Sequence, residues 1–90
     1  MVLLLHIFIK WPDKSRITLG NSTDLELYHD GSNSYILNAT ADLYIDSNGD
    51  DLYLRASDDV VIQSQSSENA VYCTGNSGVQ LYHNGSEKLE

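Results

Sequence analysis

The 90-residue sequence predicts an all-β chain built from short repeated units, and three features of the sequence predict it. From Arg16 onward, apolar residues alternate with polar ones in short bursts such as "DLELYH", "DLYID" and "VVIQS", and this period of two is typical of strands. The bursts are separated by clusters of Gly, Asn, Asp and Ser, such as "HDGSNS" and "DSNGDD", which favour turns. No window of a dozen residues carries the apolar stripe of a helix.

The spacing of the bursts indicates how the strands are stacked. An aspartate opens the bursts at Asp24, Asp42, Asp51 and Asp59, and the last three lie eight or nine residues apart. Such a unit is one strand and one turn, which cannot bury its apolar face alone and must stack on its neighbours. A compact sandwich or barrel, a single-chain parallel β-helix and an intertwined trimer all fit this period. The only Phe and the only Trp lie within the first eleven residues, so a bulky globular core is not expected. We therefore predict an elongated repeat β-structure, of the triple-stranded β-helix or β-prism type, formed by an intertwined homotrimer.

Residues 1–15 differ from the rest of the chain, and we expect an N-terminal apolar arm or strand there, followed by a single β-repeat domain over 16–90. The run "MVLLLHIFI" is too short to span a bilayer. A secretory signal would carry its positive charge before the apolar run, whereas Lys10 follows it. A segment that docks on a partner is favoured over a signal peptide or an unstructured start.

The charge balance restricts the partners. The chain has 13 Asp and Glu against 5 Lys and Arg, a formal net charge of −8. Nucleic acid and anionic membrane surfaces require the opposite sign, so neither is an expected partner, and no membrane insertion is expected. The single cysteine, Cys73, excludes an intrachain disulfide and is interpreted as a small apolar strand residue.

The alternation predicts which side chains form the core. Successive strand residues point to opposite faces, so the aliphatic residues at alternate positions of a burst share one face. We expect that face to lie in the core of the trimer. The predicted core residues are Leu25, Leu27, Leu43, Ile45, Leu52, Leu54, Val60, Ile62, Val79 and Leu81.

One motif occurs twice, as "LYHDGS" from Leu27 and as "LYHNGS" from Leu81. Asp-Gly and Asn-Gly favour two-residue type I′ hairpin turns, because both central residues require positive φ. We predict structural turns at Asp30-Gly31 and at Asn84-Gly85. The preceding residues, His29 and His83, then end their strands, and symmetry copies of either histidine around an axis are a weak candidate for a metal site.

Other site chemistries are less well supported by the sequence. The segment "DSNGDD" at residues 46–51 is similar to the start of a calcium loop, but Ser57 stands where an EF-hand requires its bidentate glutamate. Asp58 and Asp59 are neighbours and so point to opposite faces of a strand, which makes them a poor acid–base pair. No Gly-x-Ser-x-Gly elbow occurs. We expect no enzymatic activity, no cofactor and no resident metal.

Two stretches carry a resemblance to a known family. The string "DLELYHDGSNSYI" is the specific one, and "GVQLYHNGSEKLE" is similar to the family's closing unit. With the more generic units between them, residues 16–90 resemble repeat segments of tail-fibre and tail-spike proteins of tailed bacteriophages. Residues 1–15 match no part of that pattern, and the chain is expected to be a fragment of a longer fibre or a small separate reading frame.

The resemblance implies a homotrimeric shaft or tip of a virion tail fibre, located outside the cell, that takes part in host attachment. It implies contacts with other virion proteins and with a host-surface glycan or receptor, and no catalysis. Candidate receptor-contact residues are Tyr28, Tyr35, Tyr44 and Tyr53, which otherwise pair across strands. A small carbohydrate-binding β-domain is the alternative function, and a calcium-dependent adhesin repeat comes third. The sequence does not specify the host, the receptor or the choice between shaft and tip.

Overall fold

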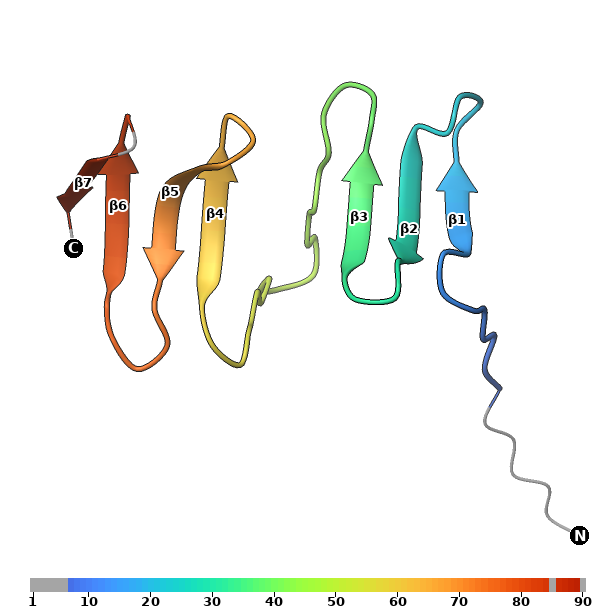
Figure 1. Ribbon diagram of the computed structural model, residues 1–90, viewed down its shortest axis with the longest axis horizontal. Coiled ribbons are helices and arrows are strands. Elements are labelled where there is room, and N and C mark those ends of the chain that lie inside the picture. The colour runs from blue at the N-terminus through green and yellow to red at the C-terminus, as the bar shows by residue number, and fades with distance from the viewer. Residues whose placement is uncertain (1–6, 85, 90) are drawn as a thin grey trace, which may run out of the picture. The chain divides into compact units, whose positions relative to one another are not determined.

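A computed structural model describes residues 7–84 and 86–89, and this part of the chain is all-β. The all-β prediction is confirmed, because the described residues form strands and turns and no helix. None of them therefore forms a helix that is long and apolar enough to cross a membrane. The chain divides into two units, Met1–Ile45 and Asp46–Glu90, and each contains one antiparallel sheet (Figure 1).

The sheets are simple meanders in which each strand pairs with its neighbour in sequence. The N-terminal sheet has the order β1-β2-β3, and the C-terminal sheet has the order β4-β5-β6-β7. The strands are β1 (Arg16–Leu19), β2 (Leu25–His29), β3 (Ser34–Asn38), β4 (Val60–Ser64), β5 (Glu68–Cys73), β6 (Val79–His83) and β7 (Ser86–Leu89).

The first copy of the repeated motif closes the β2–β3 hairpin with a turn one residue later than predicted. His29 pairs with Ser34, and the Asp30 N–H donates to the Asn33 carbonyl at 3.0 Å, so the central turn residues are Gly31 and Ser32 in place of the predicted Asp30 and Gly31. The reason is the Asp30 carboxylate, whose Oδ1 accepts the backbone N–H groups of Ser32 at 2.9 Å and Asn33 at 2.8 Å. Gly31 has φ +108°, which favours glycine at that position. An Asx-type turn therefore replaces the expected type I′ turn.

The second copy closes the β6–β7 hairpin with a two-residue connection. His83 pairs with Ser86, and only residues 84 and 85 lie between them. Asn84 has φ 51°, a left-handed conformation that asparagine tolerates better than most residues. Gly85, the other predicted turn residue, lies outside the described residues, as do residues 1–6 of the predicted arm. The same motif thus closes two hairpins whose turns are centred on different residues of the motif.

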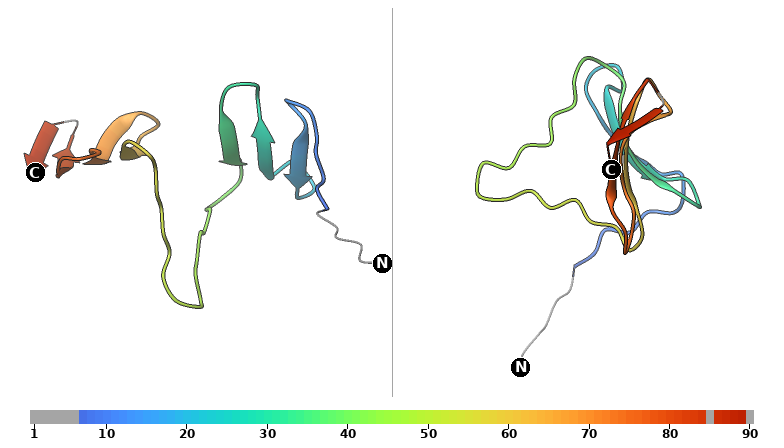
Figure 2. Two further views of the ribbon diagram at one scale, coloured as in Figure 1. Left: turned by 90° about the horizontal axis from the view of Figure 1, so that it is seen from below. Right: turned by 90° about the vertical axis from the view of Figure 1, so that its left-hand side faces the viewer.

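The middle of the chain does not form the strands that its alternation predicts. Strands were expected in "DLYID" at 42–46 and "DLYLR" at 51–55, but the structure assigns none between β3 and β4. Within the described residues, no backbone hydrogen bond joins 42–55 to another segment of the chain. Figure 2 draws this region as a long loop without arrows, coloured green to yellow. Most of the backbone of 42–55 forms neither a helix nor a turn. These segments therefore lack a neighbouring strand with which to pair.

Neither sheet has a covered face. None of the described side chains is buried, and large aliphatic side chains remain accessible, with Leu19 52% and Ile36 61% exposed. Within each sheet, strands contact only their neighbours in the meander. Sheets of this size require a second layer for independent stability. In the described residues each sheet therefore has the pattern of a core-facing surface without buried side chains.

The left-handed backbone of Asn84 leads to a prediction about the β6–β7 hairpin. Replacing Asn84 with Val places a β-branched residue at positive φ, which costs about 1–2 kcal/mol. We expect Asn84→Val to increase amide exchange across the Tyr82–Glu87 pair, whereas Asn84→Gly preserves it. Hydrogen exchange followed by NMR measures both variants. Equal exchange in the two variants would contradict the assignment of this conformation.

Candidate functional site

The N-terminal sheet has one aliphatic face. Residues directly opposite each other in an antiparallel pair project to the same side. Ile17 pairs with Leu27, and Leu27 pairs with Ile36, while Leu19 pairs with Leu25. These five side chains therefore lie together on what we call the N-terminal aliphatic face. Ile17 is 43% and Leu27 37% exposed, so this face meets solvent in the single chain.

The C-terminal sheet repeats this arrangement. Ile62 pairs with Val71, which pairs with Leu81. Val60 pairs with Cys73, and Cys73 pairs with Val79. These residues form the C-terminal aliphatic face, where Cys73 is half-buried and has apolar partners on both sides. The cysteine thus occupies the kind of strand position that its sequence context predicts.

The predicted core residues divide into two groups. Six lie on the two aliphatic faces, namely Leu25, Leu27, Val60, Ile62, Val79 and Leu81. The other four, Leu43, Ile45, Leu52 and Leu54, lie on the strandless middle segment and are 45–63% exposed. Sequence reasoning missed Ile17, Leu19, Ile36 and Val71. The alternation in "RITLG", "SYILN" and "AVYCT" was the signal that could have included them.

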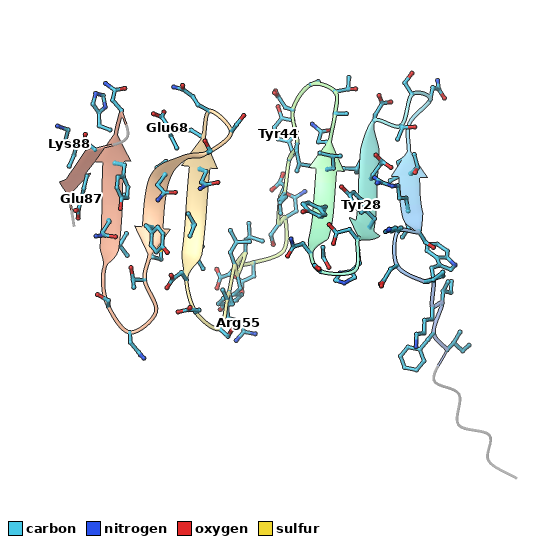
Figure 3. All side chains as sticks on the ribbon, in the orientation of Figure 1. Tyr28, Tyr44, Arg55, Glu68, Glu87 and Lys88 are labelled. Carbon is cyan, nitrogen blue, oxygen red and sulfur yellow. The ribbon has the colours of Figure 1, made fainter. Side chains whose placement is uncertain are left out.

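The opposite face of the N-terminal sheet carries a row of stacked side chains. The Arg16 guanidinium lies 3.8 Å from the centre of the Tyr28 ring, and Tyr28 stacks on Tyr35 with ring centres 5.0 Å apart and planes inclined by 24°. Arg16 also forms a salt bridge with Glu26, with Nη1 and Oε2 3.2 Å apart. We call this row the tyrosine ladder; Figure 3 labels Tyr28 within it. Such contacts fix the register of the three strands.

The four candidate receptor tyrosines do not form one platform. The structure brings Tyr28 and Tyr35 together in the tyrosine ladder. Tyr44, labelled in Figure 3, and Tyr53 lie on the strandless middle segment and are 82% and 74% exposed. The Tyr53 hydroxyl donates a long hydrogen bond of 3.4 Å to Asp51. Only the stacked pair therefore has a fixed geometry on a sheet.

The two histidines occupy equivalent places at the ends of the aliphatic faces. Alternation along β2 puts His29 on the side of Leu25 and Leu27, and its Nδ1 lies 2.9 Å from Ser34 Oγ. In the same way His83 lies on the side of Val79 and Leu81, and its Nε2 lies 3.2 Å from Asn84 Nδ2. Among the described residues, no group of three or more His, Cys, Asp or Glu could hold a metal ion. The axial metal site thus stays a prediction about an assembly.

The aspartates that open strands act as caps. Asp59, which precedes β4, accepts the backbone N–H of Gly75 at 2.9 Å and the hydroxyl of Tyr72 at 2.8 Å. Both bonds favour the charged carboxylate and hold the pKa of Asp59 below its ordinary value. The bond between the Tyr72 hydroxyl and Asp59 also raises the pKa of Tyr72. Asp30 has a lowered pKa for a similar reason, the N–H groups of Asn33 and Ser32. These lowered pKa values accompany hydrogen bonds that close turns.

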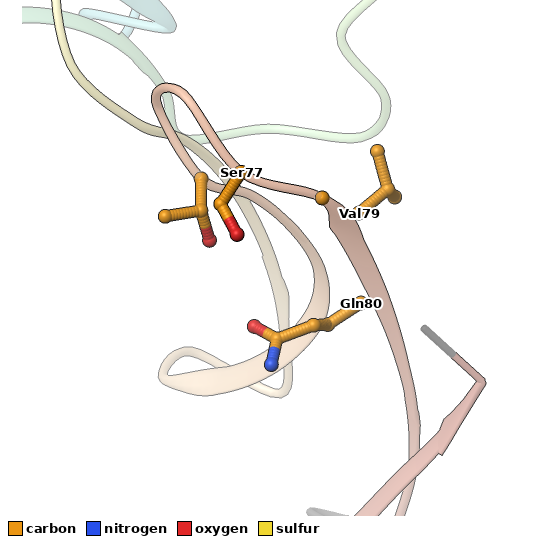
Figure 4. Close-up of a pocket in the computed structure, with 5 residues that line it drawn as sticks. Ser77, Val79 and Gln80 are labelled. Carbon is orange, nitrogen blue, oxygen red and sulfur yellow. The ribbon is translucent and has the colours of Figure 1, made fainter.

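A shallow hollow lies at the turn between β5 and β6. Figure 4 shows it, and its lining consists of Thr74, Ser77, Gly78, Val79 and Gln80. The turn is closed by backbone bonds from Thr74 N–H to the Gly78 carbonyl and from Ser77 N–H to the Thr74 carbonyl. No acid, base or nucleophile of a catalytic kind lines it beyond two hydroxyls. The hollow is a by-product of the turn.

The Asp59 cap leads to a prediction about pH. Because the folded-state pKa lies below the ordinary value, the cap stabilises the fold at neutral pH and is lost as the pH falls below about 4, through the lowered pKa. We expect protection of the Gly75 amide to decrease over that range. Asp59→Asn keeps an acceptor for this N–H but removes the titration, so its Gly75 protection should be flat there. Amide exchange at several pH values measures both, and identical acid profiles would contradict the assignment.

The candidate metal ligands allow a test of the metal hypotheses. The acidic segment at 46–51 and the two histidines are the candidate ligands that the sequence suggests. We expect the thermal midpoint of the protein to be the same with EDTA as with added calcium or zinc. A midpoint raised by either ion would show that a site forms in the assembled protein, since binding to the folded state stabilises it.

Comparison with known proteins adds no information to this geometry. No protein-family model, no curated protein and no solved structure matches the chain. Function therefore has to be argued from the two aliphatic faces, the tyrosine ladder and the repeated motifs of the sequence.

Proposed function

We propose that this chain is a structural segment of a homotrimeric viral fibre, of the phage tail-fibre or tail-spike type, which serves as a shaft or tip in host attachment. The observation that carries the proposal is the pair of uncovered aliphatic faces on single-layer sheets. The resemblance of residues 16–90 to phage fibre repeats supplies the kind of assembly. No catalytic role is part of the proposal.

The energetic argument starts from the missing second layer. Removing apolar surface from water contributes roughly 25 cal/mol per Å². A single chain gains little of this, because Ile36, Leu19 and their neighbours stay accessible. Three copies that turn their aliphatic faces toward a common axis supply one another's second layer. Each copy carries the same faces, so a closed symmetric assembly satisfies all of them at once.

The net charge sets a condition on the assembly. Each copy carries a formal charge of −8, so copies repel one another at low ionic strength. Salt screens such repulsion over a distance of about 10 Å at 0.1 M. The hydrophobic contribution must exceed this repulsion, and association should become stronger as salt is added. The sign of this salt dependence separates the proposal from binding to a cationic partner, which salt would weaken.

A small carbohydrate-binding β-domain is the second candidate, and the tyrosine ladder is the observation that favours it. The Tyr28 ring lies between Arg16 and Tyr35, so the ring that can stack on a sugar is Tyr35, which is 40% exposed. Against this function stands the lack of a core in the described residues, which a globular binding domain requires. A glycan array run on the assembled protein tests this activity directly.

Sedimentation tests the proposed trimer by measuring the oligomeric state. The N-terminal sheet provides a matched pair of variants for this test. Leu27 and Leu37 are 37% and 43% exposed and lie on opposite faces of adjacent strands. We expect the unaltered chain to sediment as a trimer. Leu27→Asp should abolish the trimer because it places a charge on the aliphatic face, whereas Leu37→Asp should retain it.

Two results would contradict the proposal. The first is a folded monomer at every protein concentration, with a thermal midpoint that does not depend on concentration. The second is an equal effect of Leu27→Asp and Leu37→Asp on the assembly, which would mean that the aliphatic face is not the contact. Raising the salt concentration should move the equilibrium toward the trimer.

A further inference from the structure

The strandless middle segment contains two stretches whose sequence predicts strands but which pair with no strand of the described chain. Residues 42–45, "DLYI", and 51–54, "DLYL", repeat the pattern of the tetrad "DLEL" at residues 24–27, whose last three residues belong to β2. In the middle segment the same pattern leaves Ile45 60% and Leu54 63% exposed. The backbone of 42–55 has no hydrogen bond to another segment among the described residues. The sequence of each stretch favours a strand, but no described strand of the same chain pairs with it.

The β2–β3 and β4–β5 hairpins, which an aspartate also precedes, show how a paired unit is closed. Asp24 precedes β2, and its Oδ1 accepts the Thr40 hydroxyl at 2.8 Å while its carbonyl accepts the Ala39 N–H at 2.8 Å. Asp59 precedes β4 and accepts the Gly75 N–H at 2.9 Å. In both cases the donors come from residues just after the paired strand, β3 or β5. The opening aspartate thus closes its unit only when a second strand lies beside it.

Asp42 and Asp51 open the two unpaired units and lack this closure. Among the described contacts, Asp42 accepts no hydrogen bond, and Asp51 accepts only the long bond from Tyr53 at 3.4 Å. Their tetrads put Leu43 and Ile45, or Leu52 and Leu54, on one side and a highly exposed tyrosine on the other. This is the division that β2 has in the N-terminal sheet. A neighbour with an aliphatic edge strand would complete both units.

The chain itself has such edges. β3 and β4 are edge strands of their sheets, and they flank the middle segment in sequence. Each presents unpaired backbone groups and exposed aliphatic residues, with Ile36 61% and Ile62 49% exposed. One copy therefore carries two stretches without partners and four open sheet edges, of which β3 and β4 flank those stretches in sequence. A second copy of the same chain supplies both complements, which no unrelated partner is required to do.

We propose that residues 42–46 and 51–55 become strands by pairing with open sheet edges of a second copy of this chain, so that the middle segment is the part exchanged between copies. This inference rests on the proposed trimer and adds to it the segment that intertwines. Backbone pairing gives the exchange its affinity, and the Leu-x-Leu spacing sets its register.

The experiment uses the full chain at a salt concentration and protein concentration where sedimentation gives the assembly. Hydrogen exchange of the amides in 42–46 and 51–55 should slow by at least about 100-fold on assembly. Isotope-filtered NMR on a mixture of labelled and unlabelled copies should then show contacts between methyl groups of Leu43 or Leu52 in one copy and an edge strand of the other. Residues 47–50, the bend between the two stretches, should remain fast-exchanging.

The outcomes separate the two proposals. If no assembly forms, the proposed function fails and the exchange fails with it. If the assembly forms while 42–46 and 51–55 exchange freely, or if their contacts lie within one copy, the exchange is wrong and the trimer stands.

A matched pair of variants adds a second readout. Leu52→Asp should restore fast exchange over 51–55 in the assembly, whereas Tyr53→Asp, one residue along and on the other side, should leave the protection in place. Equal loss of protection in both variants would overturn the face assignment and the exchange with it.

Discussion

The constraint on which this protein depends is that an antiparallel sheet with one aliphatic face needs a second layer, and neither sheet of this chain has one. Ile17, Leu27 and Ile36 line up across three strands, and Ile62, Val71 and Leu81 do the same in the other sheet. None of the described side chains is buried. Strand pairing and turns are thus specified locally, while the described residues bury no side chain and so gain little of the hydrophobic contribution that normally dominates folding.

The sequence predicted the all-β class and most strands because both depend on local pattern. Alternation and turn residues define the hairpins from Leu25 to Asn38 and from Val79 to Leu89 without reference to any contact. The position of the turn was harder to predict. In "DGSN" the Asp30 carboxylate accepts two backbone N–H groups and the turn is centred on Gly31 and Ser32, whereas Asn84 adopts positive φ and is itself a central turn residue. The exchange of Asp for Asn between the two motifs therefore changes their geometry.

Other features depend on register or on partners, which a single sequence does not specify. The tyrosine ladder requires Arg16, Tyr28 and Tyr35 to lie opposite one another, which follows only once the β1–β2–β3 register is known. The strands expected around Leu43 and Leu52 have the right alternation but no neighbour in this chain, so pattern alone overestimated what one copy can form. Alternation indicates that a segment can form a strand, but the strand forms only where another strand pairs with it.

The two faces of each sheet also determine which residues the proposed fibre presents to its surroundings. Tyr72 pairs with Val61 and Gln80 on the side opposite the C-terminal aliphatic face, and its hydroxyl bonds Asp59. Tyr28 and Tyr35 stand on the corresponding side of the N-terminal sheet, with Arg16 and Glu26. When copies cover the aliphatic faces, these tyrosine faces become the outer surface. In the proposed fibre the same alternation directs the aliphatic side chains inward and the tyrosines outward, so the proposed assembly and the proposed glycan contact follow from one pattern.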